Sequence, residues 1–173
     1  MNEAVKLVGD LLAISARTAP KAGGQDYVVI EVVSDEKDLK RLAAEMEKYG
    51  AEVPKKNFDR DGRNVANSAA VVLIGLKDAT TVGLNCGACG NSRCKELPPA
   101  KEGSEFKGPS CAWRFMDLGI AAGSAVKTAS ILNVDNRVMY RIGVLARKLG
   151  LIDADVVLGI PLSATGKSPY FDR

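Results

Sequence analysis

The sequence predicts one domain of the mixed α+β (mixed α/β) class, in which helices flank a small sheet. Stretches with apolar residues at helical spacing alternate with short runs of β-branched residues, which are typical of buried strands. Of the 173 residues, 46% are apolar and 26% are charged, and the net charge is +3. A chain of this length buries enough apolar surface to form one core, so we expect residues 1–173 to form a single domain.

The N-terminal part is predicted to form a helix followed by a strand. Apolar residues in 3–16 recur at helical spacing and charged residues fall outside that set, which indicates an amphipathic helix. The Pro- and Gly-containing segment 18–24 ends this helix. Residues 27–33 are mostly β-branched and predict a largely buried strand.

A second helix and a second strand are expected next. Ser34 can act as the N-cap of the helix, and Gly50 can end it. Residues 51–67 are mostly polar and charged, and we interpret them as a connecting segment. The apolar run 69–76 then predicts another buried strand.

A core helix is predicted over 115–132, because this stretch is apolar nearly all round. Gly119 and Gly123 lie four residues apart in it, which favours close packing on a neighbouring element. Asp117 and Lys127 bracket its apolar face, and we expect both side chains to lie in water near the helix ends.

The C-terminal part is predicted to contain one more helix and a third strand. Asp135 or Asn136 can cap the helix, and Gly150 ends it. Residues 156–160 are apolar and predict the strand, and the tail from Pro161 onward is expected to be irregular.

All four cysteines lie in one long segment, 77–112, that has neither helical nor strand periodicity. Their spacing is Cys-x2-Cys-x4-Cys-x16-Cys, formed by Cys86, Cys89, Cys94 and Cys111. A segment this long without regular structure in a compact domain is usually functional. Because disulfides do not persist in a reducing cytoplasm, clustered thiols predict metal ligation, and we interpret 77–114 as an inserted iron-sulfur loop.

Two kinds of metal site compete for four thiolates, an iron-sulfur cluster and a structural zinc ion. Zinc sites usually use two tight Cys-x2-Cys pairs, whereas here three ligands come early and the fourth is remote, as in ferredoxins. Gly87 and Gly90 follow the first two cysteines, so the backbone can aim N–H groups at sulfur. The segment 77–114 also carries six Lys or Arg against four Asp or Glu, which offsets the negative charge of a four-thiolate cluster.

Composition excludes several other kinds of chemistry and partner. The chain has no histidine, which rules out His general bases, His-containing metal sites and nucleophile–His pairs. Only 5% of residues are aromatic and the charges are of mixed sign, so we expect no nucleic-acid partner. The longest apolar stretches fall far short of the roughly 20 residues of a membrane span, and Met1–Lys6 lacks a signal-peptide pattern, so we expect a cytoplasmic protein without a membrane partner.

The chain resembles, end to end, a prokaryotic family of ferredoxin-domain-containing proteins. The residues that carry the resemblance are the cysteine loop and the segments 16–22, 117–126, 135–137, 159–163 and 166–173. In that family the four cysteines hold one [4Fe-4S] cluster. The resemblance therefore implies that Cys86, Cys89, Cys94 and Cys111 are the ligands of such a cluster.

A weaker resemblance, carried by the order of elements and by a Pro-containing turn, is to small FMN-dependent nitroreductases. Those proteins are intertwined homodimers with flavin at the subunit interface, so the resemblance implies a nitroreductase-like core, a homodimer and FMN as a possible second cofactor. Their flavin-contacting turn reads Ala-Pro-Ser-x-x-Asn, and the matching segment here is Ala19-Pro20-Lys21-Ala22-Gly23-Gly24. Lys21 replaces the Ser and Gly24 replaces the Asn, and the paired N-terminal arginines of nitroreductases are missing.

A flavin or anionic-substrate site is expected where cations adjoin glycine-rich backbone. Its candidate residues are Arg17, Lys21, Gly23, Gly24, Lys167 and Arg173. The alternative is that these cations are ordinary solvated surface charges. Tyr170 and Asp172 are candidates for proton transfer, without a visible partner, and Arg137 is expected to pair with an acid.

The sequence thus predicts an iron-sulfur redox protein, as either an oxidoreductase that passes electrons to a flavin or small substrate, or a non-enzymatic protein. The non-enzymatic alternatives are an electron carrier, a sensor of oxygen or iron, and a domain in which a cluster or zinc only holds the loop together. Neither the redox partner nor the substrate can be identified from the sequence.

Overall fold

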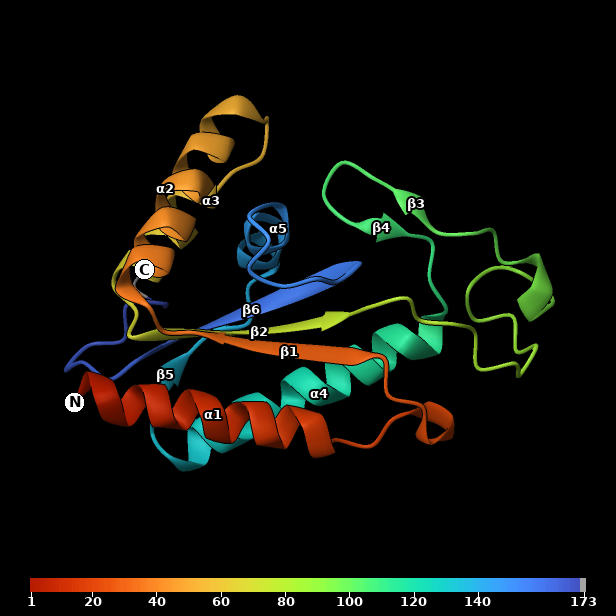
Figure 1. Cartoon of the computed structure of the whole chain (residues 1–173), viewed down its shortest axis with the longest axis horizontal. Coiled ribbons are helices and arrows are strands. Elements are labelled where there is room, and N and C mark those ends of the chain that lie inside the picture. Colours follow the sequence, from red (N-terminus) through yellow and green to blue (C-terminus); the bar gives the residue numbers. More distant parts are fainter. Residues whose placement is uncertain (172–173) are drawn as a thin grey trace.

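The computed structural model describes residues 1–171, in which a four-stranded antiparallel sheet carries helices on both faces (Figure 1). The strands lie in the order β1-β2-β6-β5. Their bounds are β1 Val28–Val33, β2 Ala70–Leu76, β6 Val156–Ser163 and β5 Asp135–Asn136. The predicted α+β class is therefore confirmed.

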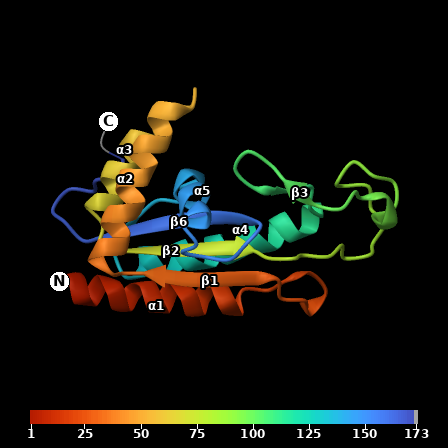
Figure 2. The same ribbon diagram turned by 45° about the horizontal axis from the view of Figure 1, so that its top comes forward.

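Two helices cover one face of the sheet and three cover the other (Figures 1 and 2). On one face lie α1 (Asn2–Thr18) and α4 (Ala112–Ile131). On the other lie α2 (Glu36–Glu52), α3 (Phe58–Ala66) and α5 (Tyr140–Lys148). None of the helices in the described part of the chain has the length and apolar character that crossing a bilayer requires.

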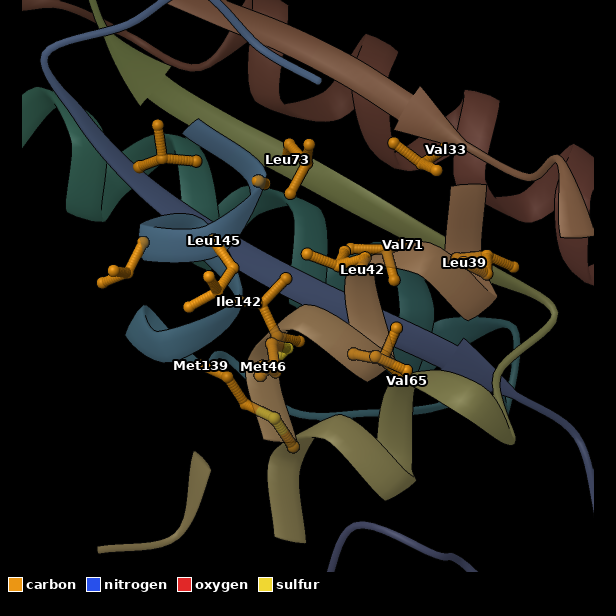
Figure 3. Close-up of a cluster of buried hydrophobic side chains, with 14 of the residues drawn as sticks. Val33, Leu39, Leu42, Met46, Val65, Val71, Leu73, Met139, Ile142 and Leu145 are labelled. Atoms are coloured by element: carbon orange, nitrogen blue, oxygen red, sulfur yellow. The ribbon is translucent and has the colours of Figure 1, made fainter. Parts of the chain in front are cut away.

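Strand β2 lies at the centre of the sheet, and its side chains enter two separate cores. Val71 and Leu73 pack with α2, α3 and α5, as Figure 3 shows, whereas Val72 and Ile74 pack with α1 and α4. Side chains of a strand alternate between its two faces, so a strand with helices on both faces must be apolar throughout. This explains why residues 70–76 form an uninterrupted apolar run.

Helix α5 lies directly against the backbone of β6, and glycine permits this approach. A Cβ atom added at Gly143 would lie 1.9 Å from the carbonyl oxygen of Val157, which no side chain can occupy. On the strand, a Cβ atom at Gly159 would lie 2.2 Å from Ile142 Cγ2. The two glycines therefore fix how closely this helix and this strand pack.

The prediction that 51–67 is only a connecting segment is wrong, because α3 forms within it. The helix begins after Asn57, which has a positive φ and makes no side-chain cap bond, so the usual N-terminal pattern is missing. It also buries the polar residues Asp61 and Asn64 beside Phe58 and Val65, which obscures its apolar face in the sequence.

The bounds of α2 also differ from the prediction. Asp35 rather than Ser34 is the N-cap, since its carboxylate accepts the backbone N–H groups of Lys37 and Asp38. The helix continues past Gly50 to Glu52. Gly50 lies inside the helix and packs closely on α3. A Cβ atom there would meet the Cβ of Phe58 at 2.7 Å, so the position has no room for a side chain.

Two predictions for the C-terminal part are corrected as well. Asp135 and Asn136 form the short strand β5 beside the end of β6, and α5 begins only at Tyr140, so neither residue caps it. Strand β6 continues through Pro161 to Ser163 instead of becoming irregular. At Pro161 the only neighbouring strand is β2, because β5 pairs only with the last two residues of β6. Proline is tolerated where a strand is paired on one side only.

The cysteine segment projects from the end of the sheet at which β2 terminates (Figures 1 and 2). It contains the short helix η2 (Cys94–Glu96) and a small hairpin of β3 (Lys101–Glu102) and β4 (Lys107–Gly108). Helix α4 then starts at Ala112, three residues before the predicted 115. Because no residue of 77–104 is buried, packing alone gives this segment little support.

Candidate metal centre

All four cysteines line one small cavity between the end of β2 and the start of α4. Cys86 is exposed, Cys89 and Cys94 are half-buried, and Cys111 is buried at the N-cap position of α4. Within residues 1–171, no group of three or more Cys, Asp or Glu side chains converges closely enough to hold a single metal ion. The four thiols thus share one cavity without meeting at a single point.

Three of the sulfur atoms accept hydrogen bonds from N–H groups of the loop or of the first turn of α4. Trp113 Nε1 donates to Cys86 Sγ (3.2 Å), and the backbone N–H of Asn85 donates to Cys94 Sγ (3.3 Å). Asn91 Nδ2 lies 3.8 Å from Cys89 Sγ. The backbone N–H of Ala88 and then the indole of Trp113 lower the pKa of Cys86 below its ordinary value. These donors stabilise the thiolate, which is the form that binds metal.

Short-range contacts shape the loop around the cavity. Asn85 Oδ1 accepts the backbone N–H of Cys94 (2.9 Å), so the first and third ligand regions lie side by side. Gly87 and Gly90 both have positive φ, and the N–H of Gly90 donates to the carbonyl of Gly87 (2.9 Å). This tight turn requires glycine, and Cys89 within it lines the same cavity as the other thiols.

A fully buried arginine, Arg114, connects the cysteine loop to the rest of the protein. Its Nε donates to the carbonyl oxygen of Thr80 (2.8 Å), where the loop begins. Its Nη1 donates to the carbonyl of Ala22 (3.0 Å) and to Asp117 Oδ2 (3.2 Å), and its Nη2 donates to Gln25 Oε1. One guanidinium group therefore forms hydrogen bonds with the loop, with helix α4 and with the turn that precedes β1.

The prediction that Asp117 lies in water is wrong, whereas Lys127 is exposed as expected. Asp117 is only 3% exposed, and its second oxygen accepts the backbone N–H of Ala22 (2.7 Å). The carboxylate thus completes the network of Arg114, and a charge is tolerated in the interior because both its oxygens are bonded.

The cations predicted near the glycine turn make internal contacts. Lys21 Nζ donates to the carbonyls of Arg17 (2.6 Å) and Ala19 (2.8 Å) and so satisfies the C-terminus of α1. Arg17 Nη1 donates to Asp26 Oδ2 (2.6 Å) and to the carbonyl of Val28 (2.6 Å). Burial acts to raise the pKa of Asp26, but bonds from Arg17 and from the N–H of Val28 outweigh it and lower the pKa.

The structure does not bring the predicted anion-site residues together. Gly23 and Gly24 have positive φ in the short turn η1 (Ala22–Gly24), which precedes β1, and open space adjoins Gly24. Lys167 follows the end of β6, whose last residues pair with the start of β2, so it lies at the opposite end of the sheet. Arg173 lies outside the described residues.

The remaining polar candidates make contacts with the core. Tyr170 is buried, its hydroxyl lies 2.8 Å from Ser68 Oγ, and burial raises its pKa above the ordinary value. Arg137 donates to the carbonyl of Tyr170 (2.8 Å) and pairs with no acid among residues 1–171, so it holds the C-terminal segment in place. Asp172 lies outside the described residues.

Comparison with solved structures defines the class of fold. A nitroreductase with bound FMN from Desulfitobacterium hafniense superposes with a TM-score of 0.60 at 14% identity, over 96% of this chain and 82% of that one. A nitroreductase with bound FMN from Bacteroides fragilis gives a TM-score of 0.57 at 12% identity, over 96% and 86% of the two chains. The protein has the nitroreductase fold, with the cysteine loop and its cavity beside the end of β2, and at these identities the likeness extends to the fold alone.

The family follows from the sequence comparisons. A model described as "uncharacterized protein containing a ferredoxin domain" matches residues 107–173. An Archaeoglobus fulgidus protein, itself described as an uncharacterized protein, is 54% identical over 99% of this chain and 93% of its own length. The chain therefore belongs to this family of ferredoxin-domain proteins, as the sequence resemblance predicted.

Sequence reasoning missed two residues of the site, Trp113 and Arg114. They follow Cys111 by two and three residues, so they occupy the first turn of the helix that the fourth ligand caps. That position was a usable signal, because a side chain one turn from a helix cap lies near the capping residue. Placing the start of the helix at 115 left both residues in the loop.

Proposed function

We propose that this protein is a redox protein in which Cys86, Cys89, Cys94 and Cys111 bind one [4Fe-4S] cluster. The observation that carries the proposal is that all four cysteines of the chain line one cavity. Membership of a ferredoxin-domain family supports iron-sulfur chemistry in this chain. A cluster held there supplies the capacity to accept and donate single electrons.

The arrangement of the thiols favours a cluster over a zinc ion. Four sulfur atoms bound to one zinc at 2.3 Å lie only about 3.8 Å apart, whereas each thiolate of a cubane cluster binds a different iron atom. A spacing of three early ligands and a remote fourth, as in ferredoxins, suits the second arrangement. The hydrogen bonds that Trp113 and Asn85 donate to sulfur are also the contacts by which proteins tune the potential of a cluster.

The residues near the glycine turn do not fit an FMN phosphate. Arg17 and Lys21 are held by carbonyls and by Asp26, and Lys167 lies at the other end of the sheet. We therefore assign no step to FMN and propose the cluster as the redox group of the protein. Whether the electrons go to a small substrate or to another protein distinguishes a reductase from a carrier.

The absorption spectrum of protein purified without oxygen, recorded before and after addition of dithionite, tests this function. We expect broad visible absorption that bleaches on reduction, together with about four iron atoms per chain. Added flavin bands would show that the protein also binds a flavin. A colourless protein that carries zinc after iron-replete anaerobic expression would contradict the redox function and leave a metal-stabilised structural domain.

We also propose that the protein forms a homodimer through the outer faces of α1 and α4. These faces expose large apolar side chains, namely Leu7, Leu11, Ile14, Phe115, Met116, Ile120 and Ile131. Gly119 and Gly123 lie exposed on α4 with open space around them, so the expected close neighbour does not come from the described part of this chain. A second copy related by a two-fold axis can approach the helix closely at these glycines.

Substitution of Ile120 by Glu is expected to convert the dimer into a monomer at micromolar concentration. The two-fold axis introduces the charge twice, and burial of an unpaired carboxylate costs several kcal/mol. Light scattering coupled to size exclusion measures the mass. Ala44→Glu on the exposed face of α2 is the control and should leave the mass unchanged. A monomeric wild-type protein would contradict the proposal.

A further inference from the structure

We propose that an acidic one-electron carrier protein docks on the tip of the cysteine segment, where Leu84 and Trp113 form an apolar centre next to the free cations Arg93 and Lys95. The inference rests on the proposed cluster and names the partner that exchanges electrons with it. In the exchange, one electron leaves the reduced carrier and one enters the oxidised cluster, and no bond is formed or broken.

In the cysteine segment, the carboxylates have internal partners whereas several of the cations do not. Every carboxylate in 77–110 is engaged by internal bonds: Asp78 with Lys107, Glu96 with the N–H of Arg93, Glu102 with Arg147, and Glu105 with Lys55. Within residues 1–171, three exposed cations of the same segment form no ion pair or side-chain hydrogen bond. They are Arg93, Lys95 and Lys101. Of the four carboxylates only Glu96 has no cationic partner in residues 1–171, so three such cations stand against one carboxylate and the balance is positive.

An apolar centre lies beside these cations. Leu84 is 59% exposed and Trp113 is 39% exposed, and both line the cavity of the four cysteines. Trp113 also donates its hydrogen bond directly to Cys86 Sγ, so one side chain touches both a ligand and the solvent. Exposed aromatic and apolar residues surrounded by charged ones are the usual composition of a protein interface.

The contacts of the loop place the two features on one surface. Asn85, next to Leu84, exchanges hydrogen bonds with Cys94, which is flanked by Arg93 and Lys95. The whole segment projects beyond the helices, away from α2 and the chain termini (Figures 1 and 2). The tip of the segment is therefore open to a partner protein.

Charge complementarity indicates an acidic partner. Unpaired cations around an apolar centre accelerate association with an anionic protein and orient it, and salt weakens this effect. The cations also offset the negative charge of the cluster, and that role changes the reduction potential, which is measured separately from binding. The two roles are therefore separable by experiment.

The test compares two doubly substituted holoproteins that carry the same change in charge. Arg93→Glu with Lys95→Glu alters the docking surface, and Lys37→Glu with Arg41→Glu alters the exposed face of α2. Binding of an oxidised acidic plant-type ferredoxin is measured by calorimetry at low and high salt, with basic cytochrome c as the opposite-charge probe. Stopped-flow absorbance then gives the rate of electron transfer from the reduced ferredoxin.

We expect the Arg93/Lys95 variant to bind the acidic ferredoxin at least tenfold more weakly than wild type at low salt, and the α2 variant to bind normally. The difference should disappear at high salt. Equal binding by wild type and the Arg93/Lys95 variant, an equal loss in both variants, or a wild type that prefers cytochrome c would overturn the proposal. Visible absorption shows that each variant holds its cluster, and the milder Arg93→Gln with Lys95→Gln replaces the Glu variant if it does not. A wild type without a cluster contradicts the proposed function instead.

Discussion

Replacement of Cys89 by Ser is expected to abolish the visible absorption of the cluster and any reductase activity of the protein. The chain has four cysteines and all of them line the cavity, so no other thiol can replace the missing ligand. A neutral hydroxyl is a poor ligand for iron, and the remaining three thiolates leave one iron atom open to solvent. Iron analysis and the spectrum of the anaerobic protein measure the loss.

Ser92→Ala is the matched control for this substitution, because Ser92 lies exposed in the same loop and lines no part of the cavity. It should retain full iron content and colour. Reductase activity that survives in the iron-free Cys89→Ser protein would show that the cluster does not transfer the electrons, even if it binds as proposed.

Substitution of Arg114 by Met is expected to lower the free energy of unfolding by about 3–5 kcal/mol, because it removes one partner of a buried charge pair. Asp117 would keep its charge in the interior, and the carbonyls of Ala22 and Thr80 would lose their donor. For a chain of this size the loss corresponds to a fall in melting temperature of roughly 10 °C. Urea unfolding of the two proteins measures it.

Arg63→Met provides the comparison, since Arg63 pairs with Asp59 on the exposed surface of α3. Loss of such a pair should cost less than about 1 kcal/mol. Arg114→Lys should fall between the two, because it keeps the charge but cannot bond four acceptors at once. A cost below about 1 kcal/mol for Arg114→Met would show that the buried network contributes little to stability.

The features that sequence predicted well are those fixed by local chemistry. The spacing of the cysteines and the apolar run of β2 depend on neighbouring residues, so both the grouping of the four cysteines and the central strand could be located without a structure. The order of the main helices and strands followed from the same periodicities. The nitroreductase fold followed from that order together with the Pro-containing turn.

The features that sequence missed depend on contacts between distant segments. Arg114 and Asp117 are buried because Thr80, Ala22 and Gln25 supply their partners. Thr80 lies 34 positions from Arg114 and Ala22 lies 92 positions from it, so no local sequence pattern reveals these contacts. Helix α3 was missed because its buried face includes Asp61, whose charge is matched by Arg60 and by Arg141 of α5. Likewise, the internal bonds of Lys21 could not be inferred from its position beside two glycines.

The position of Cys111 divides the chain into two parts that the proposed cluster would stabilise differently. Cys111 is buried at the start of a helix that packs on α1 and the sheet, so it is in place whenever the core is folded. The other three cysteines lie in a segment without buried side chains, which gains little support from packing. Under the proposed function, cluster assembly would fix this segment to a ligand that the folded core already holds, and loss of the cluster would release the segment while the core stays folded.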